Sequence, residues 1–174
     1  MADNTWHLLV QGKAFAATAT MAGIQNAGTR VLRIKQIIMV NAQSAAVTGV
    51  LCTGRIIKGV GQTWTSPTSV TPVAMDSGNS ALSSVTAGHA GTWSAGTASD
   101  LRRYAWSSDE PAVSGATWDE LENLIPLCVL WSCGLGDSAM QPLTLKQNDS
   151  VYVLNDAGAA GLADISIEFT DAAS

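Results

Sequence analysis

The chain has 174 residues, of which 47% are hydrophobic and 13% are charged, and its formal net charge is −5 at pH 7. A chain of this length is expected to form one domain over residues 1–174. It can bury roughly 70% of its unfolded surface and needs no disulfide or metal to fold. Nine Lys and Arg residues are too few for a clustered phosphate-binding surface, so DNA and RNA are not expected partners.

The chain also lacks membrane and export signals. No run approaches the ~20 apolar residues of a membrane helix, and the start, Met-Ala-Asp-Asn-Thr-Trp, has no signal-peptide pattern. We expect a protein made in the cytoplasm, with no membrane partner. Cys52, Cys128 and Cys133 are odd in number and lie in or beside apolar segments, which favours buried free thiols over a disulfide framework.

The N-terminal region is predicted to be extended. Residues 6–10 and 13–21 have the composition of two short strands, or of one strand broken at Gln11-Gly12. The competing interpretation is an N-terminal arm over residues 1–6 that leaves the domain.

Residues 30–58 are predicted to hold two long strands joined by a short polar connection. Apolar positions of the first strand share one face, namely Leu32, Ile34, Ile38 and Val40. The second strand, residues 47–57, is β-branched and apolar and has two glycines where a bulge or close packing is expected. The two strands are expected to pair as the central hairpin of an all-β domain.

Residues 59–100 form a long region rich in Ser, Thr, Gly and Ala. We predict long loops with two short strands, 70–75 and 82–86, the first confined to a sheet edge by Pro72. The uncharged surface of this region is suited to contact with another subunit.

Trp64 and Trp93 are the large aromatic residues of this loop region. They either plug the end of a sandwich or contribute to an interface, and the sequence leaves both interpretations open.

Residues 101–106 are a predicted strand that carries Arg102 and Arg103 on opposite faces. One arginine is expected to form an exposed salt bridge with Asp109 or Glu110 in the next turn.

A short helix is predicted after that turn. Thr117-Trp118-Asp119-Glu120 fits a capping box, in which the threonine hydroxyl caps the first turn and the glutamate reaches back. The helix is expected to end near Asn123.

The remaining chain reads as strands and turns. Apolar or alternating runs predict strands at 124–131, 143–146 and 151–154, and the clearest alternation places Ile165, Ile167 and Phe169 inward. The eight to ten strands expected in total favour an all-β, jelly-roll-like antiparallel β-sandwich with one short helix.

No reaction centre emerges from the residue pattern. His7 and His89 have no acidic or cysteine neighbours at metal-ligand spacing, so no metal and no cofactor are expected. Gly136-Asp137-Ser138 resembles a fragment of some esterase loops, but it lacks the nucleophile-elbow pattern and a histidine base. We expect that the chain is not an enzyme.

Several blocks of the sequence resemble those of tailed-bacteriophage structural proteins. They are Arg33 to Gly49, Arg103 to Leu145, which includes Arg-Tyr-Ala-Trp-Ser-Ser-Asp-Glu-Pro and Gln-Pro-Leu-Thr-Leu, and the terminal Ile-Glu-Phe-Thr. The likeness covers most of the chain beyond Arg30 and lies in framework and turn motifs rather than in a site signature. In size and strand pattern the chain is similar to jelly-roll capsid cement or decoration proteins.

This resemblance implies a virion protein that binds the outside of the head as a homotrimer and stabilises contacts between capsomers, with the major capsid protein as its partner. The residues expected at its interfaces are Trp6, Trp64, Trp93, Arg102 and Arg103. Two alternatives remain open. The first is a tail or head-fibre component that binds host glycan through Trp64, Trp93 and Tyr104, and the second is an esterase with Ser138 as its nucleophile.

Overall fold

The structure is a computed structural model that describes residues 4–42, 50–108, 127–133, 141–157 and 161–172. All regular elements in these ranges are β-strands: β1 (Asn4–Ala14), β2 (Ala19–Asn26), β3 (Val31–Asn41), β4 (Val50–Val60), β5 (Thr63–Thr65), β6 (Thr68–Ser69), β7 (Val73–Ala74), β8 (Val85–His89), β9 (Thr92–Ser94), β10 (Thr97–Ser108), β11 (Leu127–Ser132), β12 (Leu143–Leu145), β13 (Asp149–Ala157) and β14 (Leu162–Ala172).

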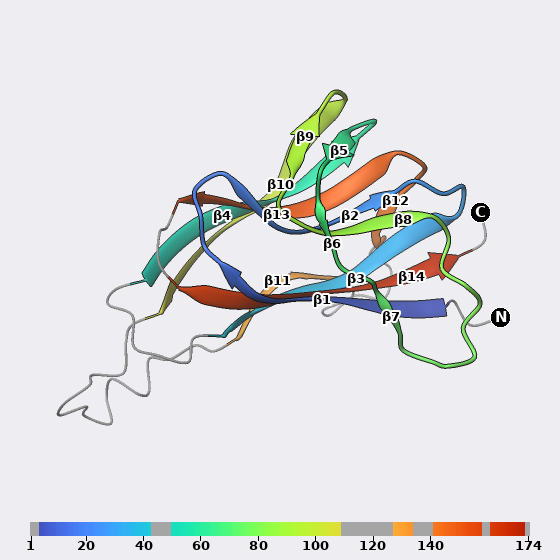
Figure 1. Cartoon of the computed structure of the whole chain (residues 1–174), viewed down its shortest axis with the longest axis horizontal. Helices are drawn as coiled ribbons and strands as arrows, with labels where there is room; N and C mark the ends of the chain where they lie inside the picture. Colours follow the sequence, from blue (N-terminus) through green and yellow to red (C-terminus); the bar gives the residue numbers. More distant parts are fainter. Residues whose placement is uncertain (1–3, 43–49, 109–126, 134–140, 158–160, 173–174) are drawn as a thin grey trace.

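The strands form two six-stranded antiparallel sheets that pack face to face (Figure 1). Sheet A has the order β11-β3-β14-β1-β7, with β12 also paired to β3, and sheet B has the order β10-β4-β13-β2-β8-β6. A separate two-stranded sheet joins β5 to β9. The expected all-β, antiparallel sandwich class is therefore confirmed.

The long strands pair in a nested pattern. β1 pairs with β14, β2 with β13, β3 with β11 and β12, and β4 with β10. Consecutive strands β1 to β4 alternate between the two sheets.

This alternation overturns the predicted hairpin at residues 30–58. Both strands exist as β3 and β4, but they lie in opposite sheets. Each strand has one strongly apolar face, and these faces are buried against each other across the sandwich rather than side by side.

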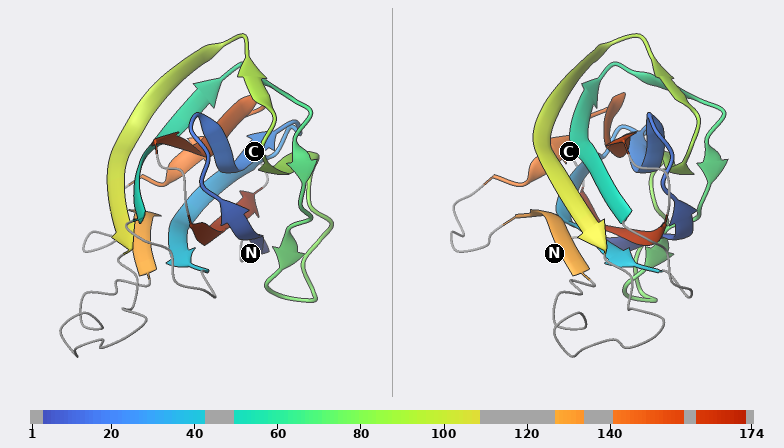
Figure 2. Two further views of the ribbon diagram at one scale, coloured as in Figure 1. Left: turned by 60° about the vertical axis from the view of Figure 1, so that its left-hand side comes forward. Right: turned by 90° about the vertical axis from the view of Figure 1, so that its left-hand side faces the viewer.

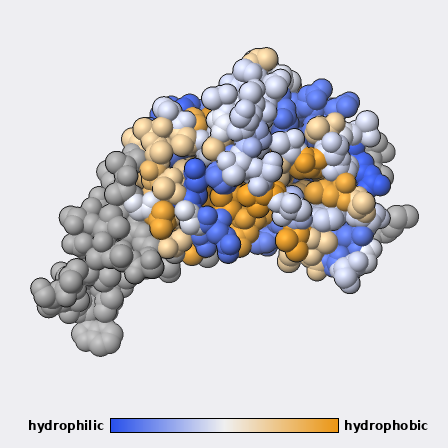
Figure 3. Space-filling model, viewed as in Figure 1, coloured by the Kyte–Doolittle hydropathy of each residue, from blue (hydrophilic) through white to orange (hydrophobic). Residues whose placement is uncertain are grey.

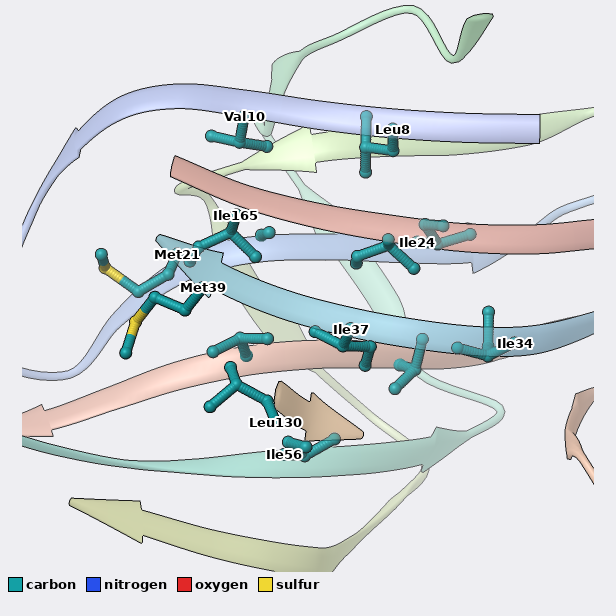
Figure 4. Packing of buried hydrophobic residues seen from close by; sticks show 14 of the residues in the cluster. Leu8, Val10, Met21, Ile24, Ile34, Ile37, Met39, Ile56, Leu130 and Ile165 are labelled. Atoms are coloured by element: carbon teal, nitrogen blue, oxygen red, sulfur yellow. The ribbon is translucent and has the colours of Figure 1, made fainter. Parts of the chain in front are cut away.

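The core fills the space between the sheets (Figure 4). Sheet A supplies side chains such as Leu8, Ile37 and Ile165, which meet Ile24 and Ile56 of sheet B. Each of these five side chains has 0% exposure. At roughly 25 cal/mol per Å² of apolar surface removed from water, such a core is the main stabilising term of the fold.

The predicted face of β3 is correct only for its first half. Leu32 and Ile34 are buried, but Ile37 and Met39 then take the inward positions in place of Ile38 and Val40. The cause is a bulge in β3. Phe169 of β14 pairs with Ile34, but the preceding residue of β14, Glu168, pairs with Gln36, so β3 has one extra residue between these two pairs. One extra residue in a strand moves every later side chain to the other face.

The C-terminal strand agrees with its predicted alternation. Ile165, Ile167 and Phe169 of β14 are fully buried between the sheets. At the other end of the chain, β1 is one strand whose register shifts between Val10 and Lys13, so the predicted break at Gln11-Gly12 is a bulge.

Residues 4–6 do not form an arm in the structure. They belong to β1, where Asn4 pairs with Asp171 and Trp6 pairs with Phe169. The first residues of the predicted arm, 1–3, lie outside the described residues.

The predicted loop region 59–100 contains more strand than expected. It holds β5 to β9 and the start of β10, and the predicted strands 70–75 and 82–86 correspond to β7 and β8 with shifted bounds. The shorter of the two, β7, lies at an edge of sheet A, as Pro72 predicted. The predicted helix at Thr117–Asn123 lies outside the described residues.

Candidate interaction surface

The outer face of sheet B carries a folded-over ribbon. β4 and β10 arch together along the molecule (Figure 2), and the same two chain segments continue as β5 and β9. The corner lies at Gly61 and Gly96, whose φ angles are +65° and +60°. A Cβ at Gly96 would meet the backbone of Val60 and Gly61, so the two segments turn together only because this position has no side chain.

The ribbon places three aromatic rings in one stack against sheet B. The Trp93 ring lies between Trp64, at a centroid distance of 4.5 Å, and Tyr152, at 4.4 Å. The Trp64 indole N–H donates to the Ala90 carbonyl at 2.8 Å, and the Trp93 indole N–H donates to the Thr20 hydroxyl at 3.0 Å. The stack therefore holds the β5–β9 sheet onto the body of the same chain.

The proposed glycan platform has no free ring face at these residues. Both faces of Trp93 are covered, and Trp64 has only 6% exposure. Tyr104 packs against the core, and burial raises the pKa of its hydroxyl. A sugar therefore has no open ring face to stack on at Trp64 or Trp93 in this conformation.

An ionic network crosses three strands on the same outer face. Arg55 of β4 donates to Asp156 of β13 through Nε at 2.9 Å and through Nη2 at 2.8 Å, and through Nη1 to Asp100 of β10 at 3.1 Å. Arg103 also contacts Asp100, with Nη2 at 3.6 Å from the carboxylate. The hydrogen bond that Arg55 donates to Asp156 is the main reason that the pKa of Arg55 is raised.

This network borders an open depression of about 510 Å³. Its lining consists of Thr53, Gly54, Arg103, Tyr104, Ala105 and Asp156. Cys52 and Ile56 of β4 belong to the core, so the alternate residues Thr53 and Arg55 face outward. The lining thus combines three small residues with the Tyr104 ring, a cation on β10 and a neutralised carboxylate on β13.

The two predicted interface arginines have different environments. Arg102 pairs with the core residue Ile56, and its Nη1 donates to the Leu130 carbonyl at 3.1 Å. It therefore bridges edge strands of the two sheets. Arg103 pairs with Arg55 on the outer face and its side chain is 78% exposed. The predicted opposite orientation agrees with these contacts, but Arg103 pairs with Asp100, and the predicted partners Asp109 and Glu110 lie outside the described residues.

Trp6 is not at an outer surface of the sandwich. It packs against the hydrophobic core from the start of β1. Of the five predicted interface residues, Arg103 is the one that lines the depression, and the interface role of all five stays a prediction.

Apolar side chains are exposed along the edge where β1, β7 and β8 come together (Figure 3). Val73 is 65% exposed, Met75 is 59% exposed and Leu9 is 36% exposed. Val73 lies opposite His7, two residues from Leu9 on the same strand, so Val73 and Leu9 are diagonal neighbours.

The long edge strands carry features that oppose pairing with another sheet. β11 has a register shift beside Leu130, and β10 has one at Leu101 next to charged residues. Bulges and charges of this kind disfavour edge-to-edge association. Contacts with other molecules are therefore better served by faces and loops of the sandwich than by its edges.

The two histidines are on different strands. His7 is on β1 and His89 is on β8, and the described residues contain no group of three or more His, Cys, Asp or Glu side chains placed to hold a metal ion. Burial, and secondarily the charge of Lys13, lower the pKa of His89. Within the same described ranges, no helix is long and apolar enough to span a membrane.

None of the three cysteines forms a disulfide, as predicted, but Cys52 alone of the three is fully buried while Cys128 and Cys133 are half-buried. Burial raises the pKa of Cys128. Ser138, the predicted nucleophile of the esterase alternative, lies outside the described residues.

The fold and this surface define a class of protein, a two-sheet antiparallel β-sandwich with an ionic network and an aromatic stack on one outer face. No family model, curated protein or solved structure matches the chain.

Sequence reasoning missed the ionic network and the role of Tyr152. Arg55 and Asp156 are 101 positions apart in the sequence. No local pattern reports such a contact, because strand register and a bulge at Asp156 bring the two side chains together.

Proposed function

We propose that the chain is a jelly-roll capsid decoration protein that binds the outside of a tailed-phage head and stabilises contacts between capsomers. The observation that carries this proposal is the resemblance of residues 33–49 and 103–145 to tailed-phage structural proteins. The strand order of the sandwich supports it independently.

The nested pairing is the support for a jelly roll. The strands of this pattern occupy eight successive positions along the chain, namely β1, β2, β3, β4, β10, β11 with β12, β13 and β14. First pairs with eighth, second with seventh, third with sixth and fourth with fifth, and the pairs alternate between sheets. A long antiparallel ribbon wrapped into two sheets has this order, and viral capsid domains are among the proteins that use such double-sheet architectures.

The physical character of the molecule suits a shell-binding role. The strands are up to 12 residues long, and the core between them contains side chains with 0% exposure. These features make the sandwich rigid. Charged residues make up only 13% of the chain, so much of its surface can seal against neighbours at a low desolvation cost. Many weak contacts repeated around a symmetric shell add up to stable attachment.

The resemblance implies a homotrimer and the major capsid protein as partner. The protected edges of β10 and β11 make face and loop contacts the expected mode, in place of strand addition. Light scattering of the purified chain measures the oligomer, and a mass of three chains is the expected result.

Counting copies in purified virions tests the function. Quantitative mass spectrometry is expected to find the chain in numbers comparable to the major capsid protein. A few copies per particle would instead place it in the tail, neck or a fibre, and absence from the virion would reject a structural role.

A further inference from the structure

Two arginines face each other directly on neighbouring strands of sheet B. Arg103 of β10 is the register partner of Arg55 of β4, and both side chains lie on the outer face. Like charges directly opposite on adjacent strands are destabilising unless an anion lies between them. Here Asp100 is that anion, and the two arginines share it.

The sharing is unequal. Arg55 makes two contacts with Asp100, at 3.1 Å and 3.3 Å, and is also held by Asp156. Arg103 reaches Asp100 only at 3.6 Å, beyond good hydrogen-bond length, and is 78% exposed. The network is neutral in total, yet its poorly satisfied positive charge lies at Arg103.

The space beside Arg103 is suited to a small acidic group. The depression of about 510 Å³ is open, and its lining beside Arg103 includes Thr53, Gly54 and Ala105 as well as the Tyr104 ring. Asp156 lies on the other side, but Arg55 neutralises it through three contacts of 2.8 to 3.0 Å. A guanidinium presents a planar fork of N–H donors that matches a carboxylate.

We propose that this depression is a docking site for an acidic side chain, Asp or Glu, of a partner protein, with Arg103 as its anchor. The proposal rests on the proposed function, in which the partner is the capsid shell. Charge complementarity selects a carboxylate, and one guanidinium that is only weakly paired with Asp100 offers a place for one such side chain.

A soluble probe tests the site without virions. Binding of a hexaglutamate peptide to the full chain is followed by NMR shifts of Gly54 and Ala105 amides, with hexaglutamine as the neutral control. Arg103→Gln is expected to weaken hexaglutamate binding roughly tenfold, the loss of one charge-assisted pair. Lys146→Gln removes an equal charge at an exposed position outside this surface and is expected to leave binding unchanged.

A second variant separates docking from a structural role. Asp100→Asn removes the internal competitor for Arg103 while Arg55 keeps Asp156, so hexaglutamate binding is expected to tighten several-fold. A purely structural network would instead make both variants less stable without opposite effects on binding. Equal binding by wild type and Arg103→Gln, or equal loss in Lys146→Gln, would overturn the proposal.

An acidic glycan is the rival ligand. Oligogalacturonate that binds through Arg103 more tightly than hexaglutamate would reject a protein partner. Copy counting in virions stays a separate measurement, so the docking site and the proposed function can fail independently.

Discussion

Trp64 and Trp93 are register partners in the small β5–β9 sheet, and their rings stack with an interplanar angle of 15°. Trp93 in turn stacks on Tyr152 of sheet B at 12°. Two residues 29 positions apart thus form one contact surface that fixes the end of the long β4–β10 ribbon to the sandwich. Their place favours the packing interpretation of these tryptophans within one chain.

Removal of the central ring of this stack is expected to destabilise the protein. Trp93→Ala should lower the free energy of unfolding by about 3 kcal/mol, because it removes two ring contacts and leaves a cavity. Trp93→Phe keeps a ring but loses the N–H group that donates to the Thr20 hydroxyl. The missing hydrogen bond should lower the free energy of unfolding by about 1 kcal/mol in addition to the loss of packing. Urea unfolding measures the stability of both variants. Equal stability of Trp93→Ala and wild type would show that the β5–β9 sheet does not contribute to the stability of the fold.

Gly96 at the ribbon corner and Gly12 in β1 provide a matched pair of glycine substitutions. Gly12 and Gly96 have nearly the same φ, +55° and +60°, but a Cβ at Gly12 has nothing within 4 Å. A Cβ at Gly96 would collide with the Val60 carbonyl oxygen. Gly12→Ala should cost about 1 kcal/mol from backbone strain, and Gly96→Ala about 3 kcal/mol because overpacking is added. Thermal unfolding of the two variants side by side checks this, and a smaller loss for Gly96→Ala would contradict the steric argument.

A buried carboxylate ties three segments at one end of the sandwich. Asp171 has a side-chain exposure of 0%, and its Oδ2 accepts from the Ser83 amide at 3.1 Å and from Arg30 at 3.3 Å. Arg30→Met should cost about 2 kcal/mol, because it leaves a buried charge without its cation.

The double variant Arg30→Met with Asp171→Asn provides the control. Its amide oxygen still accepts from Ser83 but carries no charge, so the double variant should be more stable than Arg30→Met alone. Chemical denaturation measures both, and strictly additive losses would show that the ion pair is not coupled.

Acidification should destabilise the protein through His89. Burial lowers the pKa of this imidazole in the folded state below its unfolded value of about 6.5. Above about pH 6.5 both states are neutral and the full stability is present. As pH falls, the unfolded state binds a proton first, so the free energy of unfolding decreases until the folded state is also protonated.

When the pH is lowered from 7.5 to below 6.5, the free energy of unfolding should therefore decrease less for His89→Gln than for the wild type. Unfolding free energies of both proteins at matched pH values test this, with His7→Gln as the reference histidine variant. Parallel pH profiles for wild type and His89→Gln would remove His89 as a source of acid sensitivity.

The chain's own residue pattern determined the class of the fold. β-Branched runs, alternation at Ile165, Ile167 and Phe169, and turn residues between them predict an antiparallel β protein. These signals are local, because a strand with one buried face must alternate in sequence. The break at Gln11-Gly12 and the edge position beside Pro72 were predictable for the same reason.

Tertiary structure alone decided how the strands pair and which surface they build. Neighbouring strands β3 and β4 separate into opposite sheets, and the extra residue of β3 reverses the faces of Ile38 and Val40. Arg55 meets Asp156 because the distant strands β4 and β13 share a register, and Trp93 meets Tyr152 because the β5–β9 sheet packs against sheet B. Alternation in a sequence reports that a strand has a buried face, but strand partners and bulges depend on the packing of the whole sandwich, which no local pattern encodes.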